Sequence, residues 1–176
     1  MAEIIIAGFG GQGVLVLGQV IAYAGMIENK SVSWLPSYGP EQRGGTCNCS
    51  VVVTPGEVGS PVVTVPSDAL VMNGPSFDRF EPKVSAGGLL VYNSSLVPKT
   101  SQRDDITTIA VPANEIADEL GNARIANMVM LGAFVQATGI VKEESIEEAL
   151  KAVLSERHHS LIPLNMQAFE RGRAYQ

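Results

Sequence analysis

The chain has 176 residues, of which 45% are hydrophobic and 17% are charged, and its formal net charge is −6. This length suits one ordinary domain, and the composition argues against disorder. The acidic balance and the lack of a basic block argue against nucleic-acid binding. No stretch approaches the roughly 18–20 apolar residues of a membrane span, and the amino terminus does not resemble a secretory signal. We therefore expect a single cytoplasmic domain, residues 1–176, with no membrane or nucleic-acid partner.

The amino-terminal region predicts a strand, a glycine-rich turn, a helix and a second strand. The isoleucine run within Glu3–Ala7 indicates a strand that is buried on both faces. Val14–Met26 is apolar on most faces and predicts a helix, and Lys30–Leu35 predicts the second strand. The default geometry for such a unit is a right-handed crossover with the two strands parallel.

Strand and helix patterns continue along the rest of the chain. Thr46–Thr54 alternates cysteine and valine with small polar residues, which is typical of a strand. The other predicted strands are Pro61–Val65, Asp68–Met72, Leu89–Asn93 and Ile106–Val111, and the predicted helices are Ser76–Phe80, Ala113–Leu120, Asn127–Thr138, Ser145–Leu154 and Pro163–Tyr175, the last with Asn165 as an early cap. These elements predict an α/β fold: a single Rossmann-like domain with a mostly parallel sheet flanked by helices and a helical C-terminal part.

The six residues Gly8–Gly13 match the pattern G-x-G-x-x-G between the first predicted strand and helix. Glycines let backbone N–H groups approach an anion, and a helix amino terminus adds partial positive charge. A phosphate, pyrophosphate or carboxylate would suit this turn. The candidate binding residues are Gly8, Gly10, Gly11, Gln12 and Gly13. In the alternative interpretation, the glycines serve only a tight turn and close packing of the helix on the sheet.

The second strand argues against an ordinary NAD site. Such sites usually have an acidic residue near the end of that strand, where it holds the ribose hydroxyls. Here the strand ends at Leu35-Pro36-Ser37, and the first acidic residue beyond it is Glu41, in the following loop.

The loop Ser37–Gly45 is the second candidate binding segment. Arg43 is the only positive charge between Lys30 and Arg79. Its planar guanidinium suits a phosphate or carboxylate, but it could equally pair with Glu41 or bind a partner subunit. Because the loop follows the second strand, it should leave the sheet at the same edge as the glycine-rich turn, where ligands of open α/β sheets bind. The candidate residues of this loop are Ser37, Tyr38, Arg43, Gly44 and Gly45.

Two cysteines, Cys47 and Cys49, would point to the same face of a strand, with side chains about 6–7 Å apart. We interpret them as small buried side chains. Iron–sulfur and structural zinc sites usually need four ligands, and the adjacent His158 and His159 would diverge on a helix. We expect no metal site in this chain. Nor does the sequence show a serine–histidine–acid set, so no catalytic residue is predicted.

Three segments in chain order resemble one family. They are Ile5–Val14, which contains Gly-Phe-Gly-Gly-Gln-Gly, Ser37–Thr46, which contains Gln-Arg-Gly-Gly, and Leu89–Leu96. These segments are similar to the γ subunit of 2-oxoacid:ferredoxin oxidoreductases, in the pyruvate ferredoxin/flavodoxin oxidoreductase γ-domain family. The resemblance extends over roughly residues 3–140. Cys47–Val51 looks more like the 2-oxoglutarate and branched-chain 2-oxoacid enzymes than the pyruvate enzymes.

The resemblance implies a subunit that is not catalytic alone. The complete enzyme, typical of anaerobic metabolism, would decarboxylate a 2-oxoacid on thiamine diphosphate with Mg²⁺. It would pass electrons through [4Fe–4S] clusters to ferredoxin and release an acyl-CoA. The α and β subunits, and in some enzymes a δ subunit, would be the partners of this chain. Its own role would be structural support, with a part in binding coenzyme A through Gly10–Gly13 and Arg43.

Other functions stay open at this stage. One is a stand-alone nucleotide- or phosphate-binding module, and another is a subunit of an indolepyruvate oxidoreductase, which contains a similar unit. A third is a purely structural subunit, in which both candidate loops contact only the α subunit.

Overall fold

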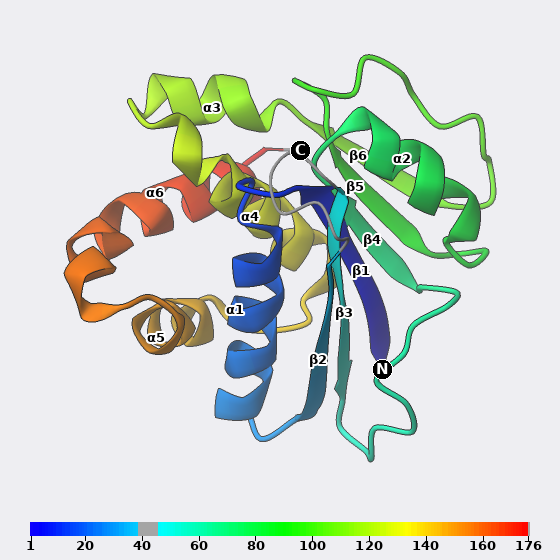
Figure 1. Ribbon diagram of the computed structural model, residues 1–176, viewed down its shortest axis with the longest axis horizontal. Coiled ribbons are helices and arrows are strands. Elements are labelled where there is room, and N and C mark those ends of the chain that lie inside the picture. Colours follow the sequence, from blue (N-terminus) through cyan, green and yellow to red (C-terminus); the bar gives the residue numbers. More distant parts are fainter. Residues whose placement is uncertain (39–45, 176) are drawn as a thin grey trace.

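A computed structural model describes residues 1–38 and 46–175, and a mixed six-stranded sheet forms its centre (Figure 1). The strands are β1 (Ala2–Phe9), β2 (Ser31–Tyr38), β3 (Thr46–Thr54), β4 (Asp68–Val71), β5 (Leu89–Asn93) and β6 (Thr107–Val111). The helices are α1 (Val14–Ile27), α2 (Gly74–Phe80), α3 (Ala113–Glu119), α4 (Ala126–Thr138), α5 (Glu143–Val153) and α6 (Ile162–Arg173). Short 3₁₀ helices occupy Glu81–Lys83, Ala123–Ile125 and Glu156–Leu161.

The strand order is β2-β3-β1-β4-β5-β6, and only β3 runs against the others. β1 and β2 therefore run in the same direction, as predicted, but β3 lies between them and is antiparallel to both. Pro36 gives a physical reason for this order, because proline donates no hydrogen bond and is tolerated on an edge strand. The prediction of a mostly parallel α/β sheet followed by a helical C-terminal part is confirmed.

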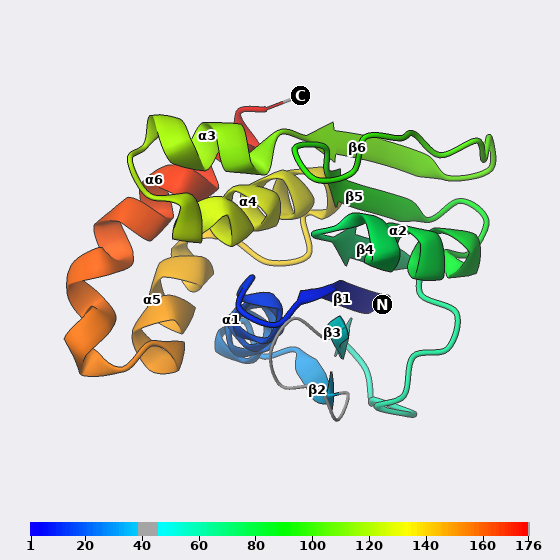
Figure 2. The same ribbon diagram turned by 45° about the horizontal axis from the view of Figure 1, so that its top comes forward.

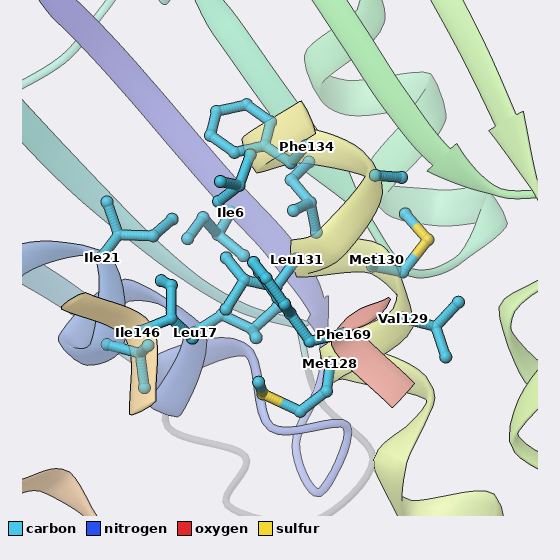
Figure 3. Packing of buried hydrophobic residues seen from close by; sticks show 14 of the residues in the cluster. Ile6, Leu17, Ile21, Met128, Val129, Met130, Leu131, Phe134, Ile146 and Phe169 are labelled. Carbon is cyan, nitrogen blue, oxygen red and sulfur yellow. The ribbon is translucent and has the colours of Figure 1, made fainter. Parts of the chain in front are cut away.

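The helices divide unequally between the two faces of the sheet. The helices α1, α3, α4, α5 and α6 cover one face, and α2 lies on the other (Figure 2). Alternate residues of β1 enter the two cores: Ile4 and Ile6 face the larger one, and Ile5 and Ala7 face the smaller one. This explains why Ile4–Ala7 in β1 is apolar at every position. Figure 3 shows Ile6 and Leu17 among the side chains of the larger core.

The helices α4 and α6 cross with their backbones in contact. A Cβ atom on Gly132 would overlap the carbonyl oxygen of Phe169, and one on Gly172 would overlap the carbonyl oxygen of Val129. Each helix therefore supplies a glycine at the point where the other approaches. The two glycines are 40 residues apart, and the sequence did not predict this contact.

Two local predictions are wrong. Pro61–Val65 forms no strand; it belongs to an irregular connection in which Val63 packs into the smaller core. Asn165 does not cap the last helix, because α6 already begins at Ile162, with Pro163 in its first turn. Proline is favoured there because its missing N–H would have no helical partner. The Asn165 side chain instead donates to the carbonyl of Leu161.

Candidate functional site

The ends of β1 and β2 lie at one edge of the sheet. Cys47, near the start of β3, pairs with Gly8 on one side and with Tyr38 on the other. Since neighbouring strands are about 4.8 Å apart, these two backbones are about 10 Å apart. The two candidate loops therefore leave the sheet at the same edge, as predicted. Ser37 and Tyr38 end β2 there, whereas Arg43, Gly44 and Gly45 lie outside the described residues.

The adjacent strands β1 and β4 form the topological switch point of the sheet. The chain leaves β1 through α1 on one face and leaves β4 through α2 on the other face (Figure 2). In open α/β sheets, ligands bind outside the carboxyl ends of the strands at such a point. The glycine-rich turn lies there.

The side chain of Gln12 links the end of β1 to the residues that directly follow β4. Its Oε1 accepts hydrogen bonds from the Phe9 N–H, at 2.7 Å, and from Asn73 Nδ2, at 3.1 Å. Its Nε2 donates to the carbonyl of Met72 at 3.4 Å. Asn73 in turn caps α2 by accepting from the Ser76 N–H at 2.9 Å. The Gln12 amide thus holds the shape of the turn, and ligand contact by Gln12 stays a prediction.

The glycines of the turn have different structural roles. A Cβ on Gly8 would lie 2.6 Å from Gln12 Oε1 and 2.9 Å from the Cβ of Met72, so Gly8 serves close packing. Gly11 and Gly13 have φ angles of 97° and 75°, which glycine adopts most easily. Gly11 is exposed and has open space around the position of a Cβ. Packing therefore explains Gly8 and backbone conformation explains Gly11.

The amino terminus of α1 presents hydrogen-bond donors at the same edge. Gly13 precedes the helix, and no side chain caps it within the described chain. The carbonyl of Gly13 accepts from the Leu17 N–H at 3.0 Å. The N–H groups of the first turn have no intrahelical partner, and they carry the positive end of the helix dipole. This arrangement is chemically suited to an anion.

Asn127, in the first turn of α4, lies against the same turn, because a Cβ on Gly13 would overlap its Nδ2 atom. The sequence predicted Asn127 only as the start of a helix. No local pattern could have found this contact, since the two residues are 114 positions apart.

Both cysteines are free, and their thiols are held in the protonated form. Burial raises the pKa of Cys49 to about 12, and its Sγ donates to the Val14 carbonyl at 3.7 Å. Burial also raises the pKa of Cys47. The thiolate is the nucleophile and the metal ligand, so neither side chain is activated for chemistry at neutral pH. Their interpretation as packing residues is consistent with these environments.

Within 1–38 and 46–175, no three histidine, cysteine, aspartate or glutamate side chains gather closely enough to hold a metal ion. In the same ranges, no helix has both the length and the apolar character needed to cross a bilayer.

Comparison with known proteins gives the family. The family model for pyruvate ferredoxin/flavodoxin oxidoreductase matches residues 3–175. The chain belongs to this family. This confirms the resemblance found in the glycine-rich turn and the Gln-Arg-Gly-Gly loop, and extends it to the C-terminal helices.

Two relatives within the family differ in length. Over 169 residues, the chain is 43% identical to the ketoisovalerate oxidoreductase subunit VorA of Methanothermobacter marburgensis, covering 95% of this chain and 35% of VorA. It is 32% identical over 173 residues to the 2-oxoglutarate synthase subunit KorC of Methanocaldococcus jannaschii, covering 97% of this chain and 91% of KorC. The chain thus spans about a third of VorA and nearly all of KorC.

Solved structures share the fold. The γ subunit of a keto/oxoacid ferredoxin oxidoreductase from Geobacter sulfurreducens is 30% identical with a TM-score of 0.83, and the match covers 98% of this chain and 96% of that one. The 2-oxoglutarate:ferredoxin oxidoreductase of Magnetococcus marinus has a TM-score of 0.88 at 23% identity. That match covers 99% of this chain but 30% of the other, and at this identity it shows the fold alone.

Proposed function

We propose that residues 1–176 act as the γ-type subunit of a multi-subunit 2-oxoacid:ferredoxin oxidoreductase in the cytoplasm. The observation that carries this proposal is the end-to-end match to KorC, which covers 97% of this chain and 91% of that subunit. The Geobacter γ subunit matches over a similar extent. The VorA match adds that the same unit occurs as a third of a longer chain.

The proposed complex converts a 2-oxoacid and coenzyme A into an acyl-CoA and CO₂, and it transfers the two electrons to ferredoxin. Its substrate is 2-oxoglutarate or a branched-chain 2-oxoacid, because the relatives are named a 2-oxoglutarate synthase and a ketoisovalerate oxidoreductase. A [4Fe–4S] cluster needs about four cysteine ligands, and this chain has two cysteines. We therefore assign the clusters, thiamine diphosphate and Mg²⁺ to the α and β subunits, or to a δ subunit.

The part we assign to this chain is structural support and binding of coenzyme A. Coenzyme A carries a pyrophosphate and a further phosphate, which need hydrogen-bond donors and a fixed cation. The first turn of α1 supplies backbone donors beside the exposed Gly10 and Gly11. From the sequence, Arg43 is the candidate cation, in the loop that leaves the same edge of the sheet.

Exposed apolar side chains on α1 support the proposal that this chain is part of a complex. Tyr23, Met26 and Ile27 are 41–55% exposed. Their spacing of three and four residues places them on one side of the last two helical turns. A cluster of this kind is stabilised when a partner removes it from water.

The complex can be tested by tagging this chain, purifying it without oxygen and weighing the proteins that accompany it. We expect α and β subunits with iron and thiamine diphosphate, and coenzyme-A-dependent viologen reduction with one of a panel of 2-oxoacids. A lone chain without iron or thiamine would overturn the proposal in favour of a stand-alone binding module. Activity with indolepyruvate alone would assign the chain to that oxidoreductase instead.

The coenzyme A role can be tested with Arg43→Ala in the assembled complex. We expect the KM for coenzyme A to rise at least about tenfold, because a charge-assisted contact to phosphate is lost, while the KM for the oxoacid stays the same. Lys151→Ala is a matched control, since Lys151 is an exposed cation on α5 that pairs with Glu147. Equal KM values in Arg43→Ala and the wild-type complex would remove Arg43 from the site.

A further inference from the structure

The side chain of Asn127 is largely buried, and its Nδ2 donor faces the glycine-rich turn. The residue is 8% exposed. Its Oδ1 accepts from the Met128 N–H at 2.9 Å, so Nδ2 is the atom that faces Gly13. Within residues 1–38 and 46–175, no hydrogen bond from Nδ2 to a protein atom is found, and Nδ2 keeps some contact with solvent, since the fully buried polar side-chain atoms without a partner there are Ser33 Oγ and Trp34 Nε1. A donor in such a position can bind an acceptor group of a ligand or a water molecule.

Two helix amino termini approach each other at this amide. Gly13 immediately precedes α1, and Asn127 is the second residue of α4. Neither helix has a side-chain cap from the residue that precedes it, within the described chain. The positive ends of both helix dipoles therefore act on the same place, together with the Nδ2 donor.

We infer that Asn127 Nδ2 and the N–H groups in the first turn of α1 bind one anionic group, such as a phosphoryl group. The groups gathered there are donors, so the complementary ligand is one that only accepts, which a phosphate or carboxylate does. Gly13 is required because any side chain there would displace the Asn127 amide. The identity of the ligand as a phosphate of coenzyme A rests on the proposed function. The binding of an anion at this place does not depend on the proposed function.

Asn127→Asp is the variant that tests the inference most directly. Aspartate keeps the size of the side chain and an oxygen that can accept from the Met128 N–H, but it replaces the donor by a negative charge. Asn122→Asp is the matched control, because it adds the same charge five residues earlier. There Oδ1 caps the short helix Ala123–Ile125 by accepting from the Arg124 N–H at 3.0 Å, which aspartate can also do. Asn127→Ala removes the donor without adding charge, and decides the case if the aspartate variant does not fold.

The first measurement is a titration of the full ¹⁵N-labelled chain with sodium pyrophosphate, followed by NMR. We expect saturable shifts of the Asn127 side-chain NH₂ pair and of the Gly13 and Val14 amides. The affinity should fall at least about tenfold in Asn127→Asp and several-fold in Asn127→Ala, and it should stay within about twofold in Asn122→Asp. An unshifted Asn127 amide, or an unchanged affinity in both Asn127 variants, would overturn the inference.

The second measurement separates this inference from the proposed function. In the assembled complex, the Asn127 variants should raise the KM for coenzyme A and leave that for the oxoacid unchanged. If the wild-type chain forms no active complex but its pyrophosphate shifts are present, the proposed function fails and the anion site stands. If the complex is active, and both Asn127 variants bind pyrophosphate and coenzyme A as the wild type does, the anion site fails and the function stands.

Discussion

The glycine-rich turn and the crossing of α4 with α6 both depend on glycines, but these glycines meet different neighbours. In the turn, the atoms nearest to a Cβ on Gly13 belong to the side chain of Asn127. At the crossing, the atoms nearest to a Cβ on Gly132 or Gly172 belong to the backbone of the opposite helix.

This difference matters because a side-chain amide can rotate away, whereas a helix backbone moves only as a unit. The turn can therefore adjust at moderate cost, and the crossing cannot. The turn also holds donors and exposed glycines, while the crossing lies in the larger core. The proposed anion site and the helix crossing thus both need glycine, but for different physical reasons.

The largest effect is expected where the crossing is broken, in Gly132→Ala and Gly172→Ala. Alanine normally favours a helix over glycine by about 1 kcal/mol. Here the added methyl group overlaps a carbonyl oxygen, so each variant should lose at least about 3 kcal/mol of unfolding free energy. Denaturant unfolding measures the loss.

Gly74→Ala is the control for this prediction. Gly74 starts α2, and no atom lies within 4 Å of a Cβ built there. The unfolding free energy of Gly74→Ala should differ from that of the wild type by less than about 1 kcal/mol. Equal losses at Gly74 and Gly132 would show that the helix crossing does not need its glycines.

A smaller effect is expected in the turn, where Gly13→Ala and Gly11→Ala separate contact from strain. Both positions have positive φ, which costs alanine about 1–2 kcal/mol. Only Gly13 also faces a side chain, so Gly13→Ala should cost about 1 kcal/mol more than Gly11→Ala. Thermal unfolding of the two variants measures the difference, and combining Gly13→Ala with Asn127→Ala should remove it.

Removing the side-chain hydrogen bonds that support the turn should have a still smaller effect on stability. Gln12→Ala removes the hydrogen bonds to Phe9, Met72 and Asn73 and should cost about 1–2 kcal/mol. Hydrogen exchange should rise first at the Phe9 amide and in the first turn of α2, while α4 and α6 stay protected. Faster exchange at the crossing would mean that the two regions are not independent.

The smallest effect is expected at Glu28, which ties the end of α1 to the chain after α4. Its carboxylate accepts from the Lys142 N–H at 2.5 Å and pairs with Lys30 at 2.8 Å. Burial opposes its ionisation, but these donors outweigh it and hold the pKa of Glu28 below its ordinary 4.5. Glu28→Gln should cost about 1 kcal/mol at pH 7.

The pH dependence of Glu28→Gln has a defined sign. A lowered pKa stabilises the fold fully above the ordinary value and loses this effect as the pH falls through the lowered one. The difference between Glu28→Gln and wild type should therefore shrink below about pH 4.5. The loss in Gly132→Ala should persist there, because overlap with a carbonyl does not titrate. A constant Glu28→Gln difference down to pH 3 would contradict the assigned contacts.

Local patterns located most of the elements correctly. Thr46–Thr54 and Leu89–Asn93 have the predicted bounds, because β-branched and alternating runs between turn residues depend on nearby sequence alone. The wrong strand at Pro61–Val65 has the same cause. Its valines suit a strand, but the sheet offers it no partner, and Val63 packs as an isolated apolar residue.

By itself, the sequence determined the α/β class, the turn at Gly8–Gly13, the shared edge of the two loops and the family. Tertiary structure alone decided that β3 lies between β1 and β2, that Gln12 bonds to Met72 just after β4, and that Asn127 faces Gly13. The reason is the sequence separation between the residues in contact. Turns, caps and strand periodicity involve residues a few positions apart, whereas these contacts join segments separated by up to 114 residues. Such contacts become visible only when the packed sheet and helices bring those segments together.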